Sequence, residues 1–437
     1  MAFPEIDFEE RERTVVDRLH QYLVPLELIK EKPTPYELRM KKEIESIWGK
    51  SCKYVLTWVG SLNKLAIVPS WHELNMRYPQ TPGAHYSHLA FEGISIEPVT
   101  NSSNEVVGGN LILFKQRMQR FKRSINSLML NLPLEIDIFP QAIIDHASIL
   151  GKDVLETIDP NTQKKIPTRA YVRPAAMRLG NFGICPKAED GMSLDNIIWS
   201  WPFYLPEKVY SEGASAALFL NQQRKQKIVG KHAGNYGSAG VASSIARKTG
   251  CDESIIFGPY VIDQEGQKIY VNSDTSEGRK ILSERGVLAD GPGEDIIFED
   301  RDGNIVISPM DTNILGGTTR EYILKIAKNN LMGVKEYPVS VESIRNGEIV
   351  GMAFVGNAVK FAPVKEIKLC DRENGKTKII ETFRFENEAR NLGILQSVFN
   401  DELQGKRDQT GDLLTPIDLE NGKKAREKLD QIYAPWF

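Results

Sequence analysis

The spacing of apolar residues in the first half of the chain predicts a strand followed by a helix. Residues 108–130 begin with a short apolar run and continue with apolar side chains three and four positions apart, at Phe114, Met118 and Phe121. This spacing is typical of one face of an amphipathic helix. Further on, the short stretch at 170–177 predicts a strand.

The second half of the chain contains further strand-like patterns. Short apolar runs at 269–271, 295–300 and 304–309 predict strands. The turn dipeptide Asp302-Gly303 between the last two runs predicts a hairpin. Strands and helices do not alternate in simple βαβ order, so we expect mixed α/β construction rather than a plain Rossmann domain.

The segment ILGGTTRE at 314–321 predicts a helix start that can hold an anion. A Gly-rich turn precedes Thr318, and Glu321 follows it three residues later, which is the spacing of a capping box. Backbone N–H groups and hydroxyls at a helix start can bind phosphate. The chain has no Walker loop and no G-x-G-x-x-G at a strand-to-helix junction, so nucleotide binding is not favoured.

Composition narrows the class of protein and its partners. Hydrophobic residues make up 41% of the 437 residues and charged residues 26%, as in ordinary globular proteins. A net charge of -3 and a pI of about 6.2 favour neither nucleic acid nor an anionic membrane as a partner. The acidic amino terminus lacks the features of a secretory signal, and no later stretch predicts a transmembrane helix. We therefore expect a cytoplasmic protein.

The cysteines favour isolated reduced thiols over a metal site. They are widely separated, form no Cys-x-x-Cys pair and have no histidine nearby at metal-ligand spacing. The four are Cys52, Cys185, Cys251 and Cys370. We expect no metal centre.

Proline-containing segments predict the domain organisation. Pro202 and Pro206 lie in a linker-like stretch at 199–207, where we place the boundary between two halves. Residues 1–62 have charge-rich helical patterns, a proline-containing break and no chemical motif. We expect them to form an extension packed on the body.

Two segments leave two interpretations open. In KHAGNYG at 231–237, Lys231 is followed by small residues, which suits either a solvated surface lysine or a catalytic imine lysine in a tight neighbourhood. In GPGED at 291–295, Glu294 is either an exposed turn carboxylate or an inward-facing partner for a cationic ring.

Several segments, in order along the chain, resemble the fold-type IV (class IV) PLP-dependent aminotransferases, and most closely the branched-chain amino acid aminotransferases. The likeness covers roughly residues 63–400, apart from an apparent insertion near 259–288. Ser87, Gly316 and Asn357 stand where the family has Gly, Pro and Thr. The matching segments are HYSHLAFEG at 85–93, MQRF at 118–121, AYVRP at 170–174, KHAGNYG at 231–237, GPGED at 291–295, ILGGTTRE at 314–321 and GNAV at 356–359.

The resemblance implies a mixed α/β (α+β) fold in two domains. After the extension at 1–62, a smaller α/β domain would span 63–198 and the linker would span 199–207. A larger pseudo-barrel domain that binds pyridoxal 5'-phosphate (PLP) would span 208–437.

The resemblance also implies roles for residues that hold the cofactor. Lys231 would form the Schiff base and act as the acid/base, while Glu294 would keep the ring nitrogen protonated. Tyr236 would contact the phenolic oxygen of the ring. The residues expected to hold the phosphate are Arg120, Thr318, Thr319 and Asn357.

A second set of residues would contact the substrate. Tyr171 and Arg173 are two positions apart and therefore share one face of the expected strand. By resemblance, the arginine would meet the side-chain carboxylate of glutamate, and an apolar pocket would take leucine, isoleucine or valine. The other expected substrate contacts are Tyr86, Phe91, Tyr204 and Ala358.

We therefore expect an aminotransferase that exchanges amino groups between small-molecule L-amino acids and 2-oxo acids, and a homodimer as in the family. One alternative is a lyase of the aminodeoxychorismate-lyase type, which would release product without a 2-oxo acid acceptor. A D-amino-acid or amine transaminase is another. A scaffold without turnover is a third alternative, but it would need none of Lys231, Tyr236 and Glu294.

Overall fold

The structure is a computed structural model that describes most of the chain. The described residues are 14–25, 28–29, 32–48, 52–75, 81–130, 138–180, 191–385, 389–407 and 411–437. Cys52, Cys251 and Cys370 are buried free thiols, whereas Cys185 lies outside the described residues.

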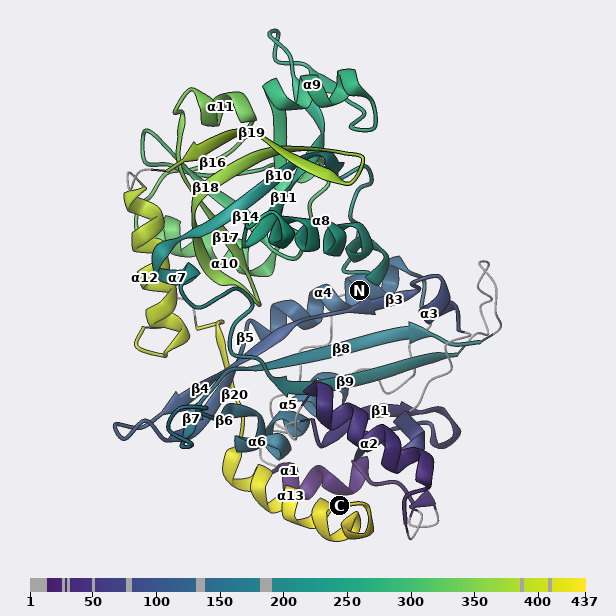
Figure 1. The fold of residues 1–437 in the computed structure, drawn as a ribbon. Coiled ribbons are helices and arrows are strands. Elements are labelled where there is room, and N and C mark those ends of the chain that lie inside the picture. The colour runs from purple at the N-terminus through teal and green to yellow at the C-terminus, as the bar shows by residue number, and fades with distance from the viewer. Residues whose placement is uncertain are drawn as a thin grey trace. The chain divides into compact units, whose positions relative to one another are not determined.

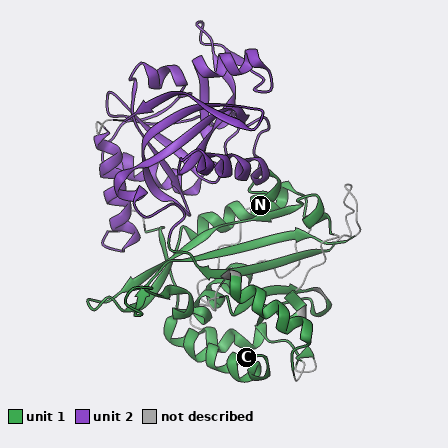
Figure 2. Ribbon diagram, viewed as in Figure 1, with its two compact units in different colours: residues 1–202, 230–234, 411–437 green, residues 203–229, 235–410 purple. Residues whose placement is uncertain are grey.

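The chain divides into two compact units (Figure 2). Unit 1 contains residues 1–202, 230–234 and 411–437, and unit 2 contains residues 203–229 and 235–410. The first boundary, between residues 202 and 203, falls inside the stretch expected to be a linker. The lysine segment at 230–234 belongs to unit 1.

Unit 1 is built on an antiparallel sheet with the strand order β2-β1-β9-β8-β4-β5-β20, and β3 pairs with β8 (Figure 1). The strand expected at 170–177 is confirmed as β8. The strands are β1 (Tyr54–Val59), β2 (Lys64–Pro69), β3 (Leu89–Phe91), β4 (Ile94–Thr100), β5 (Val106–Ile112), β8 (Ala170–Arg178), β9 (Met192–Ser200) and β20 (Leu414–Pro416). A separate two-stranded sheet joins β6 (Glu156–Ile158) and β7 (Lys165–Pro167).

The helices of unit 1 supply much of its apolar core. The amphipathic helix expected after the strand near 108 is confirmed as α4 (Phe114–Ser127), with Phe114, Met118 and Phe121 buried. α13 packs against α5, and both contribute side chains to the core that also contains β1 and β2. The other helices are α1 (Val15–Arg18), α2 (Pro35–Trp48), α3 (Pro82–His85), α5 (Phe139–Leu150), α6 (Lys152–Leu155) and α13 (Leu419–Ile432).

Two expectations about unit 1 are wrong. The boundary at residue 62 would separate β1 from the small domain, but β1 is an inner strand that pairs with both β2 and β9. Residues 411–437 were expected in the large C-terminal domain. They belong to unit 1, because β20 pairs with β5 and α13 packs on α5.

Unit 2 is built on a curled sheet with the strand order β12-β11-β10-β18-β17-β14-β15-β16, while β13 pairs with β11 and β19 with β18 (Figure 1). The pairs β10-β11, β10-β18 and β15-β16 are parallel. The strands are β10 (Ala214–Gln223), β11 (Glu253–Ile262), β12 (Lys268–Tyr270), β13 (Gly286–Asp290), β14 (Asp295–Asp300), β15 (Ile305–Ile307), β16 (Val334–Glu336), β17 (Ile349–Gly356), β18 (Lys360–Glu373) and β19 (Lys376–Arg384).

The hairpin expected in this unit is confirmed. β14 and β15 pair in antiparallel fashion, and Gly303 in the turn between them has a φ of 79°. The insertion expected near 259–288 contains β12 and α9. The helices of unit 2 are α7 (Val209–Glu212), α8 (Gly237–Lys248), α9 (Ser276–Arg285), α10 (Thr318–Asn329), α11 (Val341–Arg345) and α12 (Arg390–Leu403).

Candidate active site

Lys231 is held by two elements of unit 1. Its carbonyl oxygen accepts a hydrogen bond from the N–H of Phe91 in β3 (3.0 Å), and its own N–H donates to the hydroxyl of Ser124 in α4 (2.9 Å). The next residue, His232, forms an isolated β-bridge with Ala90. The Lys231 side chain is 9% exposed, and its Nζ lies 5.1 Å from the centroid of the Phe91 ring. The interpretation of Lys231 as a solvated surface lysine is therefore wrong.

A buried ion pair lies in the same part of unit 1. Arg120 of α4 donates through Nε and Nη2 to the two carboxylate oxygens of Glu92, at 2.8 Å and 2.7 Å. Glu92 is fully buried and also accepts the N–H of Gly93 at 2.8 Å. Arg117, one helical turn before Arg120, is buried as well and donates to the carbonyl oxygens of Ile112 (3.1 Å) and Gly93 (3.0 Å). Sequence reasoning assigned no role to Glu92 or Arg117.

Burial and neighbouring charges change the protonation of these groups. Burial, together with the positive charge of Arg120, lowers the pKa of Lys231 to about 8, while the negative charge of Glu92 opposes the change. Burial alone would raise the pKa of Glu92, but the attraction of Arg120, Lys231 and Arg117 keeps it below its usual value. Three basic side chains thus interact with one carboxylate.

The two substrate residues expected on one strand contact each other in β8. The Nη2 of Arg173 donates to the hydroxyl of Tyr171 at 3.2 Å. The Arg173 guanidinium carbon lies 4.6 Å from the centroid of the Phe91 ring. The rings of Trp199 and Trp201 lie 5.0 Å and 4.7 Å from the Tyr171 ring. Unit 1 therefore brings Lys231, Phe91, Tyr171 and Arg173 together.

The loop before β3 accommodates a departure from the family pattern. Tyr86 is the C-cap residue of α3. Ser87, which stands where the family has glycine, has a φ of 58°. Glycine adopts this left-handed conformation most easily. The chain therefore has the backbone conformation that suits the family glycine, although serine replaces the glycine itself.

In unit 2, Glu294 lies in the loop between β13 and β14. Its side chain is buried, and one carboxylate oxygen accepts the N–H of Gly293 at 3.0 Å. The other, Oε1, is buried and has no hydrogen-bond partner among the described residues. Burial raises its pKa well above the usual value, and the charge of Glu253 raises it further. The interpretation of Glu294 as an exposed turn carboxylate is therefore wrong.

Two of the tyrosines expected at the site, Tyr204 and Tyr236, belong to unit 2. The hydroxyl of Tyr204 donates to the carboxylate of Glu253 at 3.0 Å, so this hydroxyl has a partner within the protein. Tyr236 is half-buried and directly precedes α8. Sequence reasoning did not find Glu253, because a lone glutamate at the start of a strand carries no motif.

The start of α10 differs from the expected capping box. The N-cap is Gly317, which offers no side-chain cap, and Thr318 is the first helical residue. A Cβ at Gly317 would lie 1.7 Å from Oδ2 of Asp295, so any larger residue would displace this carboxylate from the helix start. Thr318 and Thr319 are buried, and the Thr318 hydroxyl has no hydrogen-bond partner among the described residues.

The turn between β17 and β18 lies beside Glu294. It contains Asn357 and Ala358. Val355 pairs with Asp295 across the sheet, and a Cβ at Gly356 would lie 3.3 Å from the Cβ of Glu294. Unit 2 thus brings together the carboxylate, the start of α10 and this turn.

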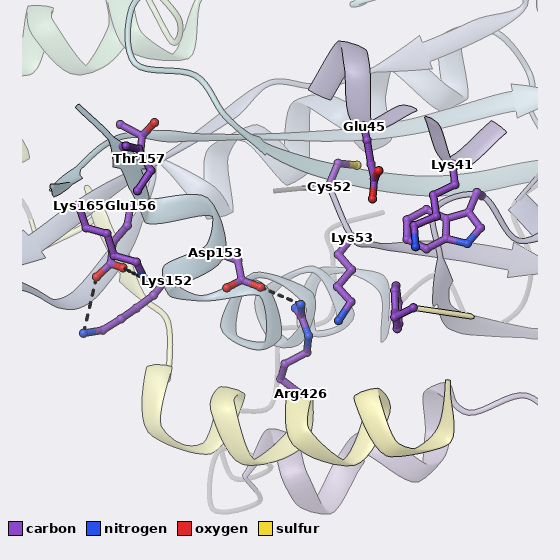
Figure 3. A pocket seen from close by; sticks show the side chains of 13 residues that line it. Lys41, Glu45, Cys52, Lys53, Lys152, Asp153, Glu156, Thr157, Lys165 and Arg426 are labelled. Carbon is purple, nitrogen blue, oxygen red and sulfur yellow. Dashed lines mark hydrogen bonds and ion pairs between the residues drawn. The ribbon is translucent and has the colours of Figure 1, made fainter. Parts of the chain in front are cut away.

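A separate cavity of about 560 Å³ lies in unit 1 among α2, α6 and α13 (Figure 3). Most of its charged side chains have partners within the protein: Arg426 pairs with Asp153 at 2.7 Å, and Lys165 pairs with Glu156 at 3.1 Å. None of the residues expected at the active site lines it.

The described residues form neither a metal-binding cluster nor a membrane-spanning helix. No group of three or more His, Cys, Asp or Glu side chains there is placed to hold a metal ion. Every helix in this part of the chain is too short or too polar to cross a membrane.

Known proteins resemble the chain in sequence and in fold. No family model matches it. It is 26% identical over 288 residues to the branched-chain-amino-acid aminotransferase of Escherichia coli K12, covering 65% of this chain and 77% of that protein. It is 25% identical over 365 residues to a probable branched-chain-amino-acid aminotransferase of Staphylococcus aureus N315, covering 79% and 86% of the two chains.

Solved structures match over a larger part of the chain. The E. coli branched-chain aminotransferase has a TM-score of 0.60 at 20% identity, over 83% of this chain and 98% of that chain. The PLP form of the Thermobaculum terrenum enzyme has a TM-score of 0.55 at 17% identity, over 84% and 98% of the two chains. The curled sheet and the mixed α/β architecture therefore define a fold-type IV protein. Within that class, the chain is distantly similar to the branched-chain amino acid aminotransferases.

Proposed function

We propose that this chain is a PLP-dependent aminotransferase for branched-chain L-amino acids, with glutamate and 2-oxoglutarate as the second pair of substrates. The observation that carries the proposal is Lys231, a buried amine whose pKa is lowered to about 8. An amine with this pKa is partly neutral near pH 7, and only a neutral amine can attack a carbonyl carbon.

Unit 1 suits an anionic phosphate group. Arg117, Arg120 and Lys231 carry three positive charges, and Glu92 carries one negative charge, so the net charge of this buried group is about +2 when all are ionised. A buried excess of positive charge is stabilised by an anionic partner. Of these residues, we propose Arg120 as the phosphate ligand.

Unit 2 contains groups that suit a protonated ring nitrogen and a phosphate. The buried Glu294 has an oxygen without a partner among the described residues, and a protonated ring nitrogen would supply both the hydrogen bond and the positive charge. The buried hydroxyl of Thr318 likewise has no partner in the described part of the chain, and phosphate oxygens accept from hydroxyls. We propose Thr319 and Asn357 as further phosphate ligands and Tyr236 as the partner of the phenolic oxygen.

Each residue has a task in the proposed reaction. When bound, PLP supplies an electron sink that stabilises negative charge at the substrate α-carbon. Lys231 would remove the α-proton when the amino acid gives up its amino group. It would supply a proton to the α-carbon when the 2-oxo acid receives the amino group. Glu294 would hold the proton on the ring nitrogen. Arg173, supported by the Tyr171 hydroxyl, would bind the side-chain carboxylate of glutamate.

The aromatic groups of unit 1 suit an apolar substrate side chain. Phe91 and Tyr171 lie beside Arg173, and Trp199 and Trp201 flank Tyr171. We propose that Phe91 and Tyr171, with Tyr86, Tyr204 and Ala358, contact the substrate. The resemblance to branched-chain aminotransferases also supports a homodimer.

Amino-group exchange between defined substrates tests the proposed function. The protein with PLP should convert L-leucine and 2-oxoglutarate to glutamate and 4-methyl-2-oxopentanoate, and Lys231→Ala should not. Lys225→Ala, at an exposed lysine paired with Asp274, is the matched control and should keep the activity. Exchange only with D-amino acids or amines, or pyruvate release without any 2-oxo acid acceptor, would contradict the proposal and favour a related transaminase or a lyase.

A further inference from the structure

Glu92 and the residue before it are connected to three elements of unit 1 that carry proposed site residues. The N–H of Glu92 donates to the carbonyl oxygen of Pro174 in β8 (2.9 Å), directly after Arg173. Its carboxylate accepts both donors from Arg120 of α4. Phe91, the residue before it, holds the backbone of Lys231 at 3.0 Å. Glu92 and its neighbour Phe91 together thus join α4, β8 and the lysine segment.

The geometry of the Glu92–Arg120 pair fixes the orientation of the arginine. Two parallel N–H···O bonds between a guanidinium and a carboxylate define a common plane, which a single bond does not. Glu92 itself is fully buried and is held by the N–H of Gly93 as well as by the arginine. Arg120 therefore has little freedom to turn, and the direction of its remaining donors is set by Glu92.

The charge of Glu92 has a second effect. Arg117, Arg120 and Lys231 are all buried, and burial of like charges in one place disfavours the charged form of each. Glu92 is the carboxylate that interacts with all three. Without its charge, the group most easily deprotonated, Lys231, would lose part of its affinity for the proton.

We propose that Glu92 is a positioning residue of the active site: it orients Arg120 toward the cofactor phosphate and retains the proton on Lys231 in the cofactor-free protein. This inference rests on the proposed function. Glu92 touches neither reacting atoms nor phosphate in this scheme. It acts through Arg120 and Lys231.

Pyridoxal and PLP used as two probes separate the two effects. Both aldehydes condense with the neutral Lys231 amine with loss of water, and borohydride then reduces the C=N bond so that mass spectrometry can locate the product. Because pyridoxal has no phosphate, its pH profile of capture reports Lys231. The ratio of PLP capture to pyridoxal capture measures how much the phosphate ligands favour the phosphorylated probe.

In Glu92→Gln, the midpoint of pyridoxal capture should fall by about one pH unit or more, because a nearby negative charge is removed. The preference for PLP over pyridoxal should fall at least about tenfold, because Arg120 loses its fixed orientation. Glu92→Asp keeps the charge but shortens the side chain, so it should keep the midpoint near the wild-type value while reducing the preference for PLP.

Glu97→Gln is the matched control, since Glu97 lies in the same sheet and pairs with Arg169 at 3.2 Å. It should change neither the midpoint of pyridoxal capture nor the preference for PLP over pyridoxal. If Glu92→Gln lowers the melting temperature but leaves both the midpoint and the ratio unchanged, Glu92 is a structural pair only and the inference is overturned. If the wild-type protein captures neither aldehyde at Lys231, the proposed function itself is wrong.

Discussion

At the scale of single residues, the site contains ionisable groups that are expensive to bury without a ligand. Glu294 combines a buried, unpartnered oxygen with a raised pKa. A group whose folded pKa is raised in this way lowers the stability of the folded protein once the pH rises above the usual value of 4.5. The cost grows as the pH rises from 4.5 toward the raised pKa of the folded state, and it disappears in acid.

Glu294→Gln should therefore separate stability from cofactor binding. The cofactor-free variant should be more stable than the wild type at pH 7, because the neutral amide removes the cost of burying a negative charge. The difference should vanish below pH 4.5. The affinity for PLP should fall at least about tenfold, because a charge-assisted hydrogen bond is lost. Denaturant unfolding and PLP titration measure the two quantities; a less stable variant at pH 7 would contradict this reasoning.

A second residue makes unit 1 sensitive to acid. His146 of α5 is fully buried, and its ring nitrogens contact the Tyr54 carbonyl oxygen and the Asn196 amide, each at 3.0 Å. Burial lowers its pKa from 6.5 to about 4. The unfolded chain therefore binds a proton between these pH values and the folded chain does not, so stability falls as the pH falls from 6.5 to 4.

His146→Gln should reduce the acid dependence of stability. Over the pH range from 6.5 to 4, the wild type should lose up to about 3 kcal/mol more than the variant, from 1.36 kcal/mol for each unit of pKa difference. Urea unfolding at several pH values measures this. His20→Gln, at an exposed position, is the control and should follow the wild type. If the free energy of unfolding changes with pH equally in the wild type and in His146→Gln, His146 does not titrate as described.

At the scale of elements, sequence patterns correctly predicted those helices and turns that depend on interactions between neighbouring residues. The three-and-four spacing of α4 and the Asp302-Gly303 hairpin were both visible in the sequence, because each depends on neighbouring residues. The start of α10 was not, since the choice of Gly317 as N-cap depends on close packing against Asp295. Because Gly317 and not Thr318 is the N-cap, the Thr318 hydroxyl has no hydrogen-bond partner among the described residues, as its proposed role as a phosphate ligand requires.

Long-range pairing explains the other errors. β1 is buried on both faces, so it shows no alternation that would distinguish it from a helical segment. β20 is three residues long and pairs with β5 about 300 positions earlier in the chain. Neither contact is encoded by a local pattern. The family resemblance implied roles for Lys231 and Glu294 but none for Glu92, whose proposed role depends on contacts with α4 and β8.

At the scale of the whole molecule, the carboxyl-terminal segment completes unit 1 after the chain has passed through unit 2. Ala425, Leu429, Tyr433 and Trp436 are buried in the apolar core of unit 1. The described core of unit 2 contains no residue from 411–437. The stability of the first unit thus depends on the last residues of the sequence.

Removal of residues 411–437 should therefore destabilise one unit selectively. Amide hydrogen exchange should become much faster in β5 and α5, which pack against the deleted segment, and should stay slow in β10 and β11 of unit 2. Unchanged protection of β5 would show that the segment adds little to unit 1. Loss of protection in both units together would show that they unfold as one.

The most direct test of the central claim is the visible absorbance of the purified protein with PLP, before and after an L-amino acid is added. The proposal that Lys231 holds PLP for transamination predicts a visible band that L-leucine or L-glutamate bleaches and 2-oxoglutarate restores. Lys231→Ala should show no such response. If the wild-type protein develops no band with PLP, or shows the same band as Lys231→Ala, the central claim is wrong.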